Sequence, residues 1–237
     1  KSEATAPEVA PAALPAIAVG AGANANGYST VALGLLSLAK ADSATALGSK
    51  TSATGDRSVA VGINATATGR YASVLGADAS AVGNATAVGA NSFASVDAAV
   101  AVGTDSKATG NYASALGAGA TASDNDSTAF GHGTVASGAS STALGTRAKA
   151  GALAAVGVGM FANATKDYGI AIGGESSSTG DSSIAIGKKS SAAGANGVAV
   201  GTNGTTAALG GVAVGQAAKS NKFNSVAMGM NVTADGD

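Results

Sequence analysis

A glycine recurs every fourteen residues along almost the whole chain. Most of these glycines close a string of one apolar or β-branched residue, one small residue and one further apolar residue, as in Val59-Ala60-Val61-Gly62. The sixteen glycines stand at positions 20, 34, 48, 62, 76, 89, 103, 117, 131, 145, 159, 173, 187, 201, 215 and 229. Every step is fourteen residues except the thirteen-residue step from 76 to 89. This constant phase predicts a tandem repeat fold, in which each unit meets neighbours of the same kind.

Side chains on both sides of the repeat glycine alternate in size with a period of two residues, which indicates strands and not helices. The residue directly before the glycine is always apolar, and the residue two before it is Ala in fourteen of sixteen units. Five residues after the glycine, Ala occurs in thirteen of sixteen units, whereas the positions four and six after it vary. Each unit is therefore predicted to form two strands and two corners. A glycine that often recurs seven residues after the repeat glycine is expected to turn the second corner at positive φ.

Consecutive units of this kind stack, so that each strand pairs in parallel with the equivalent strand of the next unit. The prediction is an all-β parallel β-roll (solenoid) of about sixteen turns over residues 16–237, roughly 75 Å long at about 4.8 Å per strand. Residues 1–15 contain all three prolines and are interpreted as an extended Pro/Ala-rich lead-in. The shortened unit between 76 and 89 is expected to cause a local bulge or kink.

The first strand of each unit has two faces, and we assign its larger side chains to the interior of the roll. The expected roll core consists of Val61, Leu75, Val102, Leu116, Phe130, Leu144, Ile172, Ile186, Val200 and Val214. The small side chains then point outward as a flat stripe, which is typical of an interface. This predicted interface between identical chains consists of Ala60, Ala101, Ala115, Ala129, Ala143, Ala171, Ala185, Ala199, Ala213 and Ala227. Its small residues would allow a close approach of identical chains, the commonest kind of oligomer.

Composition excludes several classes of function. Thirteen basic and fourteen acidic residues give a net charge of −1, which argues against a nucleic-acid partner. Cysteine is absent, so the chain has no disulfide and no thiolate metal site. His132 is the only histidine and is interpreted as a solvated corner residue. No nucleophile elbow or calcium-binding repeat motif occurs, so we expect no catalytic residue, no metal and no cofactor.

Three of the four tyrosines share one position in the repeat. Tyr71, Tyr112 and Tyr168 all stand five residues before a repeat glycine. They are candidate ligand contacts, because exposed aromatic side chains often anchor partners. Packing against a corner is the alternative interpretation.

The repeat units resemble the head repeats of trimeric autotransporter adhesins, and most of all those of the YadA type. Asn224-Ser225-Val226-Ala227-Met228-Gly229 is similar to the family's repeat almost letter for letter, and the resemblance covers residues 16–237. It implies a left-handed β-roll, a homotrimer and display on the bacterial cell surface, at the extracellular face of the outer membrane. It further implies attachment to host extracellular-matrix proteins or cells, bacterial clumping and a role in virulence. The family's stalk and membrane anchor are not recognised in this sequence, so anchoring is expected through a segment outside it.

The leading functional prediction is an adhesin head that presents a repetitive trimeric surface, without enzymatic activity. A passive spacer that holds another binding domain off the cell is the main alternative. An ice-binding solenoid is a third reading, but it would need a ladder of one residue, typically Thr. The varied side chains four residues after each repeat glycine disfavour that reading.

Overall fold

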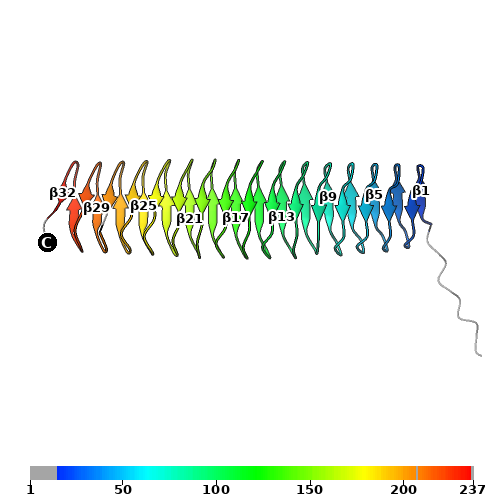
Figure 1. Cartoon of the computed structure of the whole chain (residues 1–237), viewed down its shortest axis with the longest axis horizontal. Coiled ribbons are helices and arrows are strands. Elements are labelled where there is room, and N and C mark those ends of the chain that lie inside the picture. Colours follow the sequence, from blue (N-terminus) through cyan, green and yellow to red (C-terminus); the bar gives the residue numbers. More distant parts are fainter. Residues whose placement is uncertain (1–14, 207, 236–237) are drawn as a thin grey trace, which may run out of the picture.

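The computed structural model describes residues 15–206 and 208–235, which coil into a rod of stacked turns (Figure 1). All regular secondary structure in these residues is β-strand, arranged as two parallel sheets of sixteen strands each. The predicted all-β parallel β-roll of about sixteen turns is therefore confirmed. The predicted lead-in over residues 1–15 lies, except for Pro15, outside the described residues.

Sheet A contains the three-residue strand that precedes each repeat glycine. Its strands are β1 (Ile17–Val19), β3 (Val31–Leu33), β5 (Thr45–Leu47), β7 (Val59–Val61), β9 (Ser73–Leu75), β11 (Thr86–Val88), β13 (Val100–Val102), β15 (Ser114–Leu116), β17 (Thr128–Phe130), β19 (Thr142–Leu144), β21 (Val156–Val158), β23 (Ile170–Ile172), β25 (Ile184–Ile186), β27 (Val198–Val200), β29 (Val212–Val214) and β31 (Val226–Met228).

Sheet B contains the two-residue strand that follows each repeat glycine. Its strands are β2 (Asn24–Ala25), β4 (Leu38–Ala39), β6 (Ser52–Ala53), β8 (Thr66–Ala67), β10 (Ser80–Ala81), β12 (Phe93–Ala94), β14 (Lys107–Ala108), β16 (Thr121–Ala122), β18 (Val135–Ala136), β20 (Lys149–Ala150), β22 (Asn163–Ala164), β24 (Ser177–Ser178), β26 (Ser191–Ala192), β28 (Thr205–Thr206), β30 (Lys219–Ser220) and β32 (Thr233–Ala234).

Each strand pairs in register with the equivalent strand of the next turn, so that Ala101 lies opposite Ala115. The shortened unit keeps this register in sheet A, where Ser73 pairs with Thr86, and equally in sheet B. Its missing residue falls in the corner before β11, where Gly83 takes a φ of +69°. The expected bulge or kink is therefore wrong, because the corner absorbs the deletion and both ladders continue unbroken.

The interior of the roll is filled by small side chains from both sheets. The Ala two residues before the repeat glycine is fully buried in every turn from Ala32 to Ala227 that has Ala at this position. The position four residues before the glycine and the positions three and five after it also point inward. In sheet B the small residue five after the glycine therefore lies inside, and the varied residue four after it lies outside.

The prediction for sheet A is wrong, because its two faces are reversed. All ten residues of the predicted trimer interface, from Ala60 to Ala227, are 0% exposed within the single chain and cannot contact another chain. All ten residues of the predicted roll core point outward and are half-buried or exposed. Leu75 is 54% exposed and Phe130 is 51% exposed. The physical reason is space, because the two strands of one turn lie so close together that the buried side chains of sheet A are mostly Ala, and no aromatic side chain of the described residues is buried between them.

Size compensation between facing positions shows how tight this interior is. In three turns sheet B carries Ser or Thr in place of Ala, and in the same three turns the residue directly before the sheet A strand is Gly. The pairs are Gly169 with Ser178, Gly197 with Thr206 and Gly211 with Ser220. A Cβ atom built on Gly211 would lie 2.6 Å from the Ser220 Oγ. Close packing of this kind leaves no room for an extra methyl group, so a larger side chain on one wall requires a smaller one opposite.

The two corners of a full fourteen-residue turn are β-turns of one kind. In the first corner, which begins at the repeat glycine, the Ser106 N–H donates to the Gly103 carbonyl at 3.2 Å and Asp105 has a φ of +57°. In the second corner, between sheet B and the next strand of sheet A, Tyr112 has a φ of +58°. Except for Gly83 in the shortened turn, the glycine seven residues after the repeat glycine, such as Gly110, does not supply the positive φ, so that expectation is corrected.

The repeat glycines stack above one another along the rod. Their φ angles run from +119° to +150°, a region that side-chain-bearing residues rarely adopt. A Cβ atom on Gly103 would lie 2.6 Å from the carbonyl carbon of Gly117 in the next turn. The fourteen-residue glycine period thus follows from backbone conformation and from the close approach of successive turns.

Candidate functional site

The outer face of sheet A is an apolar ladder that runs along the rod. We define this ladder as the residues one and three before each repeat glycine. Every one of them is half-buried or exposed within the single chain. In the carboxyl-terminal half of the rod the ladder includes Ile170, Ile172, Ile184 and Ile186. A continuous exposed apolar surface of this length marks an interaction site.

One place in this ladder is hollowed. Ser73 replaces the usual branched residue there, and a cavity of 270 Å³ opens beside Val59, Leu75 and Val88. The buried position behind it holds Val74 where most turns have Ala. A small outer side chain and a larger inner one thus reshape this turn locally.

The edge formed by the second corners holds the three candidate tyrosines. Tyr71, Tyr112 and Tyr168 are 44%, 66% and 57% exposed, and their φ angles are close to +60°. Tyr112 lies three turns from Tyr71 and four from Tyr168, roughly 14 Å and 19 Å at about 4.8 Å per turn. The structure therefore exposes all three side chains and does not bring them together into one site.

Tyr71 is held by two arginines. The Arg57 guanidinium donates to the Tyr71 hydroxyl at 2.6 Å, and the Cζ atom of Arg70 lies 4.9 Å from the centre of the ring. These contacts fix an otherwise exposed side chain against the rod.

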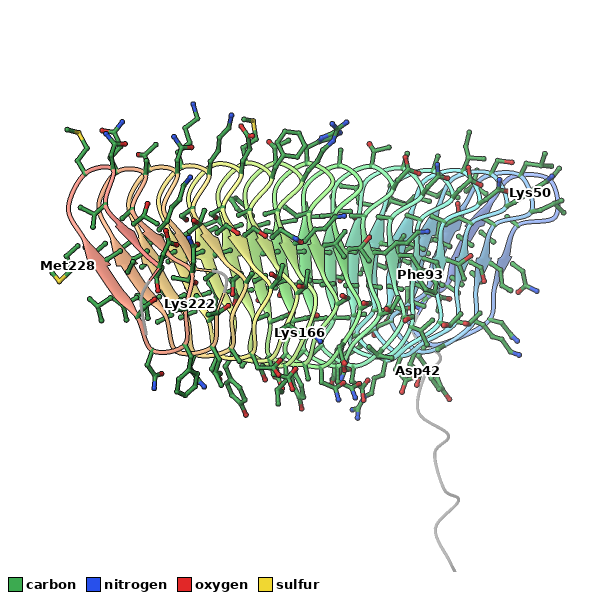
Figure 2. All side chains as sticks on the ribbon, turned by 60° about the vertical axis from the view of Figure 1, so that its left-hand side comes forward. Asp42, Lys50, Phe93, Lys166, Lys222 and Met228 are labelled. Carbon is green, nitrogen blue, oxygen red and sulfur yellow. The ribbon has the colours of Figure 1, made fainter. Side chains whose placement is uncertain are left out.

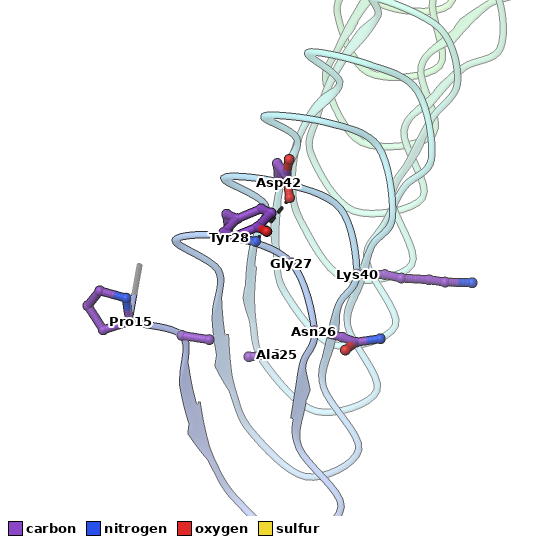
Figure 3. A pocket seen from close by; sticks show the side chains of 8 residues that line it. Pro15, Ala25, Asn26, Gly27, Tyr28, Lys40 and Asp42 are labelled. Carbon is purple, nitrogen blue, oxygen red and sulfur yellow. Dashed lines mark hydrogen bonds between the residues drawn. The ribbon is translucent and has the colours of Figure 1, made fainter. Parts of the chain in front are cut away.

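The amino-terminal end of the rod contains a hollow of 520 Å³ (Figure 3). Tyr28 and Asp42 lie on one side of it, where the Tyr28 backbone N–H donates to the Asp42 carboxylate at 3.0 Å. Lys40 and Asn26 lie on the other side, and Pro15 borders the opening. The hollow arises at the first turn, because no described turn stacks on its outer side.

A third hollow lies between a first corner and sheet B in the carboxyl-terminal half. It has a volume of 220 Å³ and is lined by Arg147, Lys149, Phe161, Ala162 and Asn163. The Arg147 Cζ atom lies 5.7 Å from the centre of the Phe161 ring. Sequence reasoning missed this group, although two cations stand two residues apart and an aromatic residue follows Arg147 by one repeat length.

Charged side chains lie on the outside of the rod, as Figure 2 shows for Lys50 on the first-corner edge and Asp42 on the opposite edge. His132 lies in a first corner, where its carbonyl accepts the Arg147 N–H at 2.9 Å. Among the described residues, no three His, Cys, Asp or Glu side chains gather closely enough to hold a metal ion. No helix in the same part of the chain is long and apolar enough to span a membrane.

Comparisons with known proteins agree with this architecture. The model of the YadA head domain repeat matches residues 15–37, 39–65, 53–79, 83–106, 108–134, 136–156, 178–203 and 208–231. Among solved structures, the crystal structure of the collagen-binding domain of the Yersinia adhesin YadA is similar to this chain at 32% identity. The TM-score is 0.48, and the match covers 58% of this chain and 70% of that chain. A comparison with curated proteins gives no match.

The stacked turns and the family match together define the head of a cell-surface adhesin, a structural protein and not an enzyme. More particularly, this chain belongs to the YadA head family, as the family model matches well over half of its length. The resemblance noted in the sequence is thus confirmed. Head domains of this class are exposed on the bacterial cell surface.

Proposed function

We infer that this head acts as a homotrimer that attaches bacteria to host extracellular-matrix proteins or to host cells. The observation that carries the inference is the combination of an apolar ladder on sheet A with a varied polar surface on sheet B. The ladder supplies an interface between identical chains, and sheet B and the corners supply a repeated outer surface. Many weak contacts along such a surface add up through avidity.

The trimer is expected to form through the apolar ladder of sheet A. Side-by-side packing of three rods would bury Ile172, Ile186 and their equivalents, which are exposed in the single chain. Burial of apolar surface contributes about 25 cal/mol per Å², so sixteen turns of such contacts favour association. The hollow at Ser73 would face the neighbouring chains within this interface.

A pair of charges placed on opposite faces of the same two turns tests this interface. We expect Ile172→Asp with Ile186→Asp to give folded monomers, because each carboxylate would have to be buried between chains. Ser177→Asp with Ser191→Asp places the same charges on sheet B and should leave the trimer intact. Molar mass by light scattering and circular dichroism provide the readouts. An unchanged trimer for the isoleucine pair would exclude sheet A as the interface.

Adhesion itself is tested with immobilised ligands. Collagen is the first choice, since it is named for the Yersinia domain, and fibronectin, laminin and whole host cells complete the panel. The folded trimer should bind at least one of them, and beads coated with it should be examined for clumping. A trimer that binds none would contradict an adhesive role and favour the passive spacer. Attachment to the outer membrane belongs to the same proposal.

A further inference from the structure

The hollow beside Arg147 is a recess on the outer surface of sheet B and a first corner. Arg147 stands in a first corner, Lys149 lies in β20, and Asn163 pairs with Lys149 from β22. Two adjacent turns thus hold two cations, an amide and the 44% exposed ring of Phe161 around one recess. Neither Arg147 nor Lys149 forms an ion pair with any described residue.

The surroundings of this hollow are basic, although the whole chain carries a net charge of −1. Lys188 and Lys189 stand in the first corner three turns further on than Arg147, roughly 14 Å away at about 4.8 Å per turn. Glu175 is the one acidic residue in the first corners and on sheet B between residues 131 and 206 of the described chain. It lies 3.7 Å from the Lys189 ammonium, so its charge is already partnered.

We propose that this hollow binds an anionic polysaccharide. The Arg147 guanidinium can hold a sulfate or carboxylate group through two parallel hydrogen bonds, with Lys149 as a second positive charge. The Phe161 ring offers an apolar surface to a sugar ring, and the Asn163 amide can donate to or accept from hydroxyl groups. Lys188 and Lys189, the latter paired with Glu175, extend the basic track along the rod, in the direction a linear chain would follow.

A polysaccharide fits these residues better than a nucleic acid does. Nucleic-acid binding depends on many cations that neutralise consecutive phosphates, and this track holds only four cations over about four turns. The site lies on sheet B and a first corner, opposite the apolar ladder, so trimer formation through sheet A leaves it open. The proposal deepens the proposed adhesive function, on which it rests, by naming a ligand class.

Binding of the complete 237-residue chain to immobilised heparin and hyaluronan tests the proposal. Arg147→Gln with Lys149→Gln should weaken binding roughly ten-fold, since two charge-assisted contacts are lost. Lys50→Gln with Lys107→Gln is the matched control, because Lys50 and Lys107 occupy the same repeat positions but stand four turns apart and do not line this hollow. This control should bind within two-fold of the parent chain. Phe161→Ala should weaken binding roughly five-fold without changing the salt dependence.

Three results would overturn the proposal. The first is an absence of binding to both polysaccharides by the folded parent chain. The second is an equal loss in the control pair, which would indicate diffuse electrostatic attraction. The third is duplex DNA binding as tightly as either polysaccharide. A preference for heparin identifies sulfate as the recognised group, and a preference for hyaluronan identifies carboxylate.

The same chains are measured against collagen, fibronectin and laminin. Polysaccharide binding without any protein ligand would contradict matrix-protein attachment and leave this inference standing. Protein binding without polysaccharide binding would contradict this inference and leave matrix-protein attachment standing. Light scattering and circular dichroism on each variant separate a lost contact from a lost fold.

Discussion

The size compensation inside the roll predicts a strong coupling between Gly211 and Ser220. The Gly211 backbone is outside the left-handed region, so alanine is conformationally acceptable there. The obstacle is the Ser220 Oγ, which would lie 2.6 Å from the new Cβ atom, while the next nearest atom, the Ala208 carbonyl oxygen, is 3.3 Å away. Gly211→Ala should therefore lower the free energy of unfolding mainly through one side-chain overlap.

The magnitude follows from three contributions. Overpacking of this kind costs about 1–3 kcal/mol, and the reduced entropy of the unfolded chain returns about 0.4–1 kcal/mol. Ser220→Ala alone removes hydrogen bonds between the Ser220 hydroxyl and Ser225 and should cost about 1 kcal/mol. The double variant places Ala opposite Ala, as in Ala155 and Ala164 of another turn, and should lie within about 1 kcal/mol of the parent.

Urea unfolding of the parent, both single variants and the double variant gives the coupling energy. We expect about 1–2 kcal/mol of favourable coupling between the two sites. Gly151→Ala is the control for glycine replacement, because its Cβ atom would have no neighbour closer than 3.7 Å. Strictly additive effects, within about 0.5 kcal/mol, would refute the assignment of these two positions to facing walls of the interior.

Three further predictions concern the same interior and the glycine stack. Gly103→Ala should destabilise the rod by about 3 kcal/mol or more, from its φ of +130° and backbone overlap, seen as a lower thermal midpoint. Ala101→Leu with Ala115→Leu should unfold several turns, detected by circular dichroism, and a folded monomer would contradict this. Ser141→Ala should raise the urea midpoint by removing a buried hydroxyl without a partner, whereas Ser106→Ala should lower it slightly by losing a 2.8 Å bond to the Gly103 carbonyl.

The repeat, the strands and the parallel stacking were predictable from the sequence, because a constant glycine period and size alternation leave few other folds. The inside and outside of sheet A were not predicted correctly. The alternation shows which side chains share a face of the strand, but it does not show which face is buried. A wrong assignment of the buried face therefore reverses every side chain of the strand. Two signals in the sequence favour the observed choice: Phe130 is too large for a thin interior, and glycine precedes sheet A wherever Ser or Thr replaces Ala on sheet B.

The hollow beside Arg147 was harder to predict for a different reason. Its residues belong to two turns and to two structural elements, and only the stacking brings Lys149 next to Asn163. The tyrosines illustrate the converse. Tyr71 and Tyr112 share a repeat position, yet a shared position places side chains along one edge and not within one site.

Because the turns stack in register, the length of the rod can change independently of the side chains that contact a partner. Deleting or duplicating one unit in the middle would move the tip by about 4.8 Å relative to the base. Only side chains in the two turns that flank the change would gain new neighbours, since each turn touches only the turns directly above and below it. Rods of different length could thus be made from this sequence by removing or adding whole units at the repeat glycines.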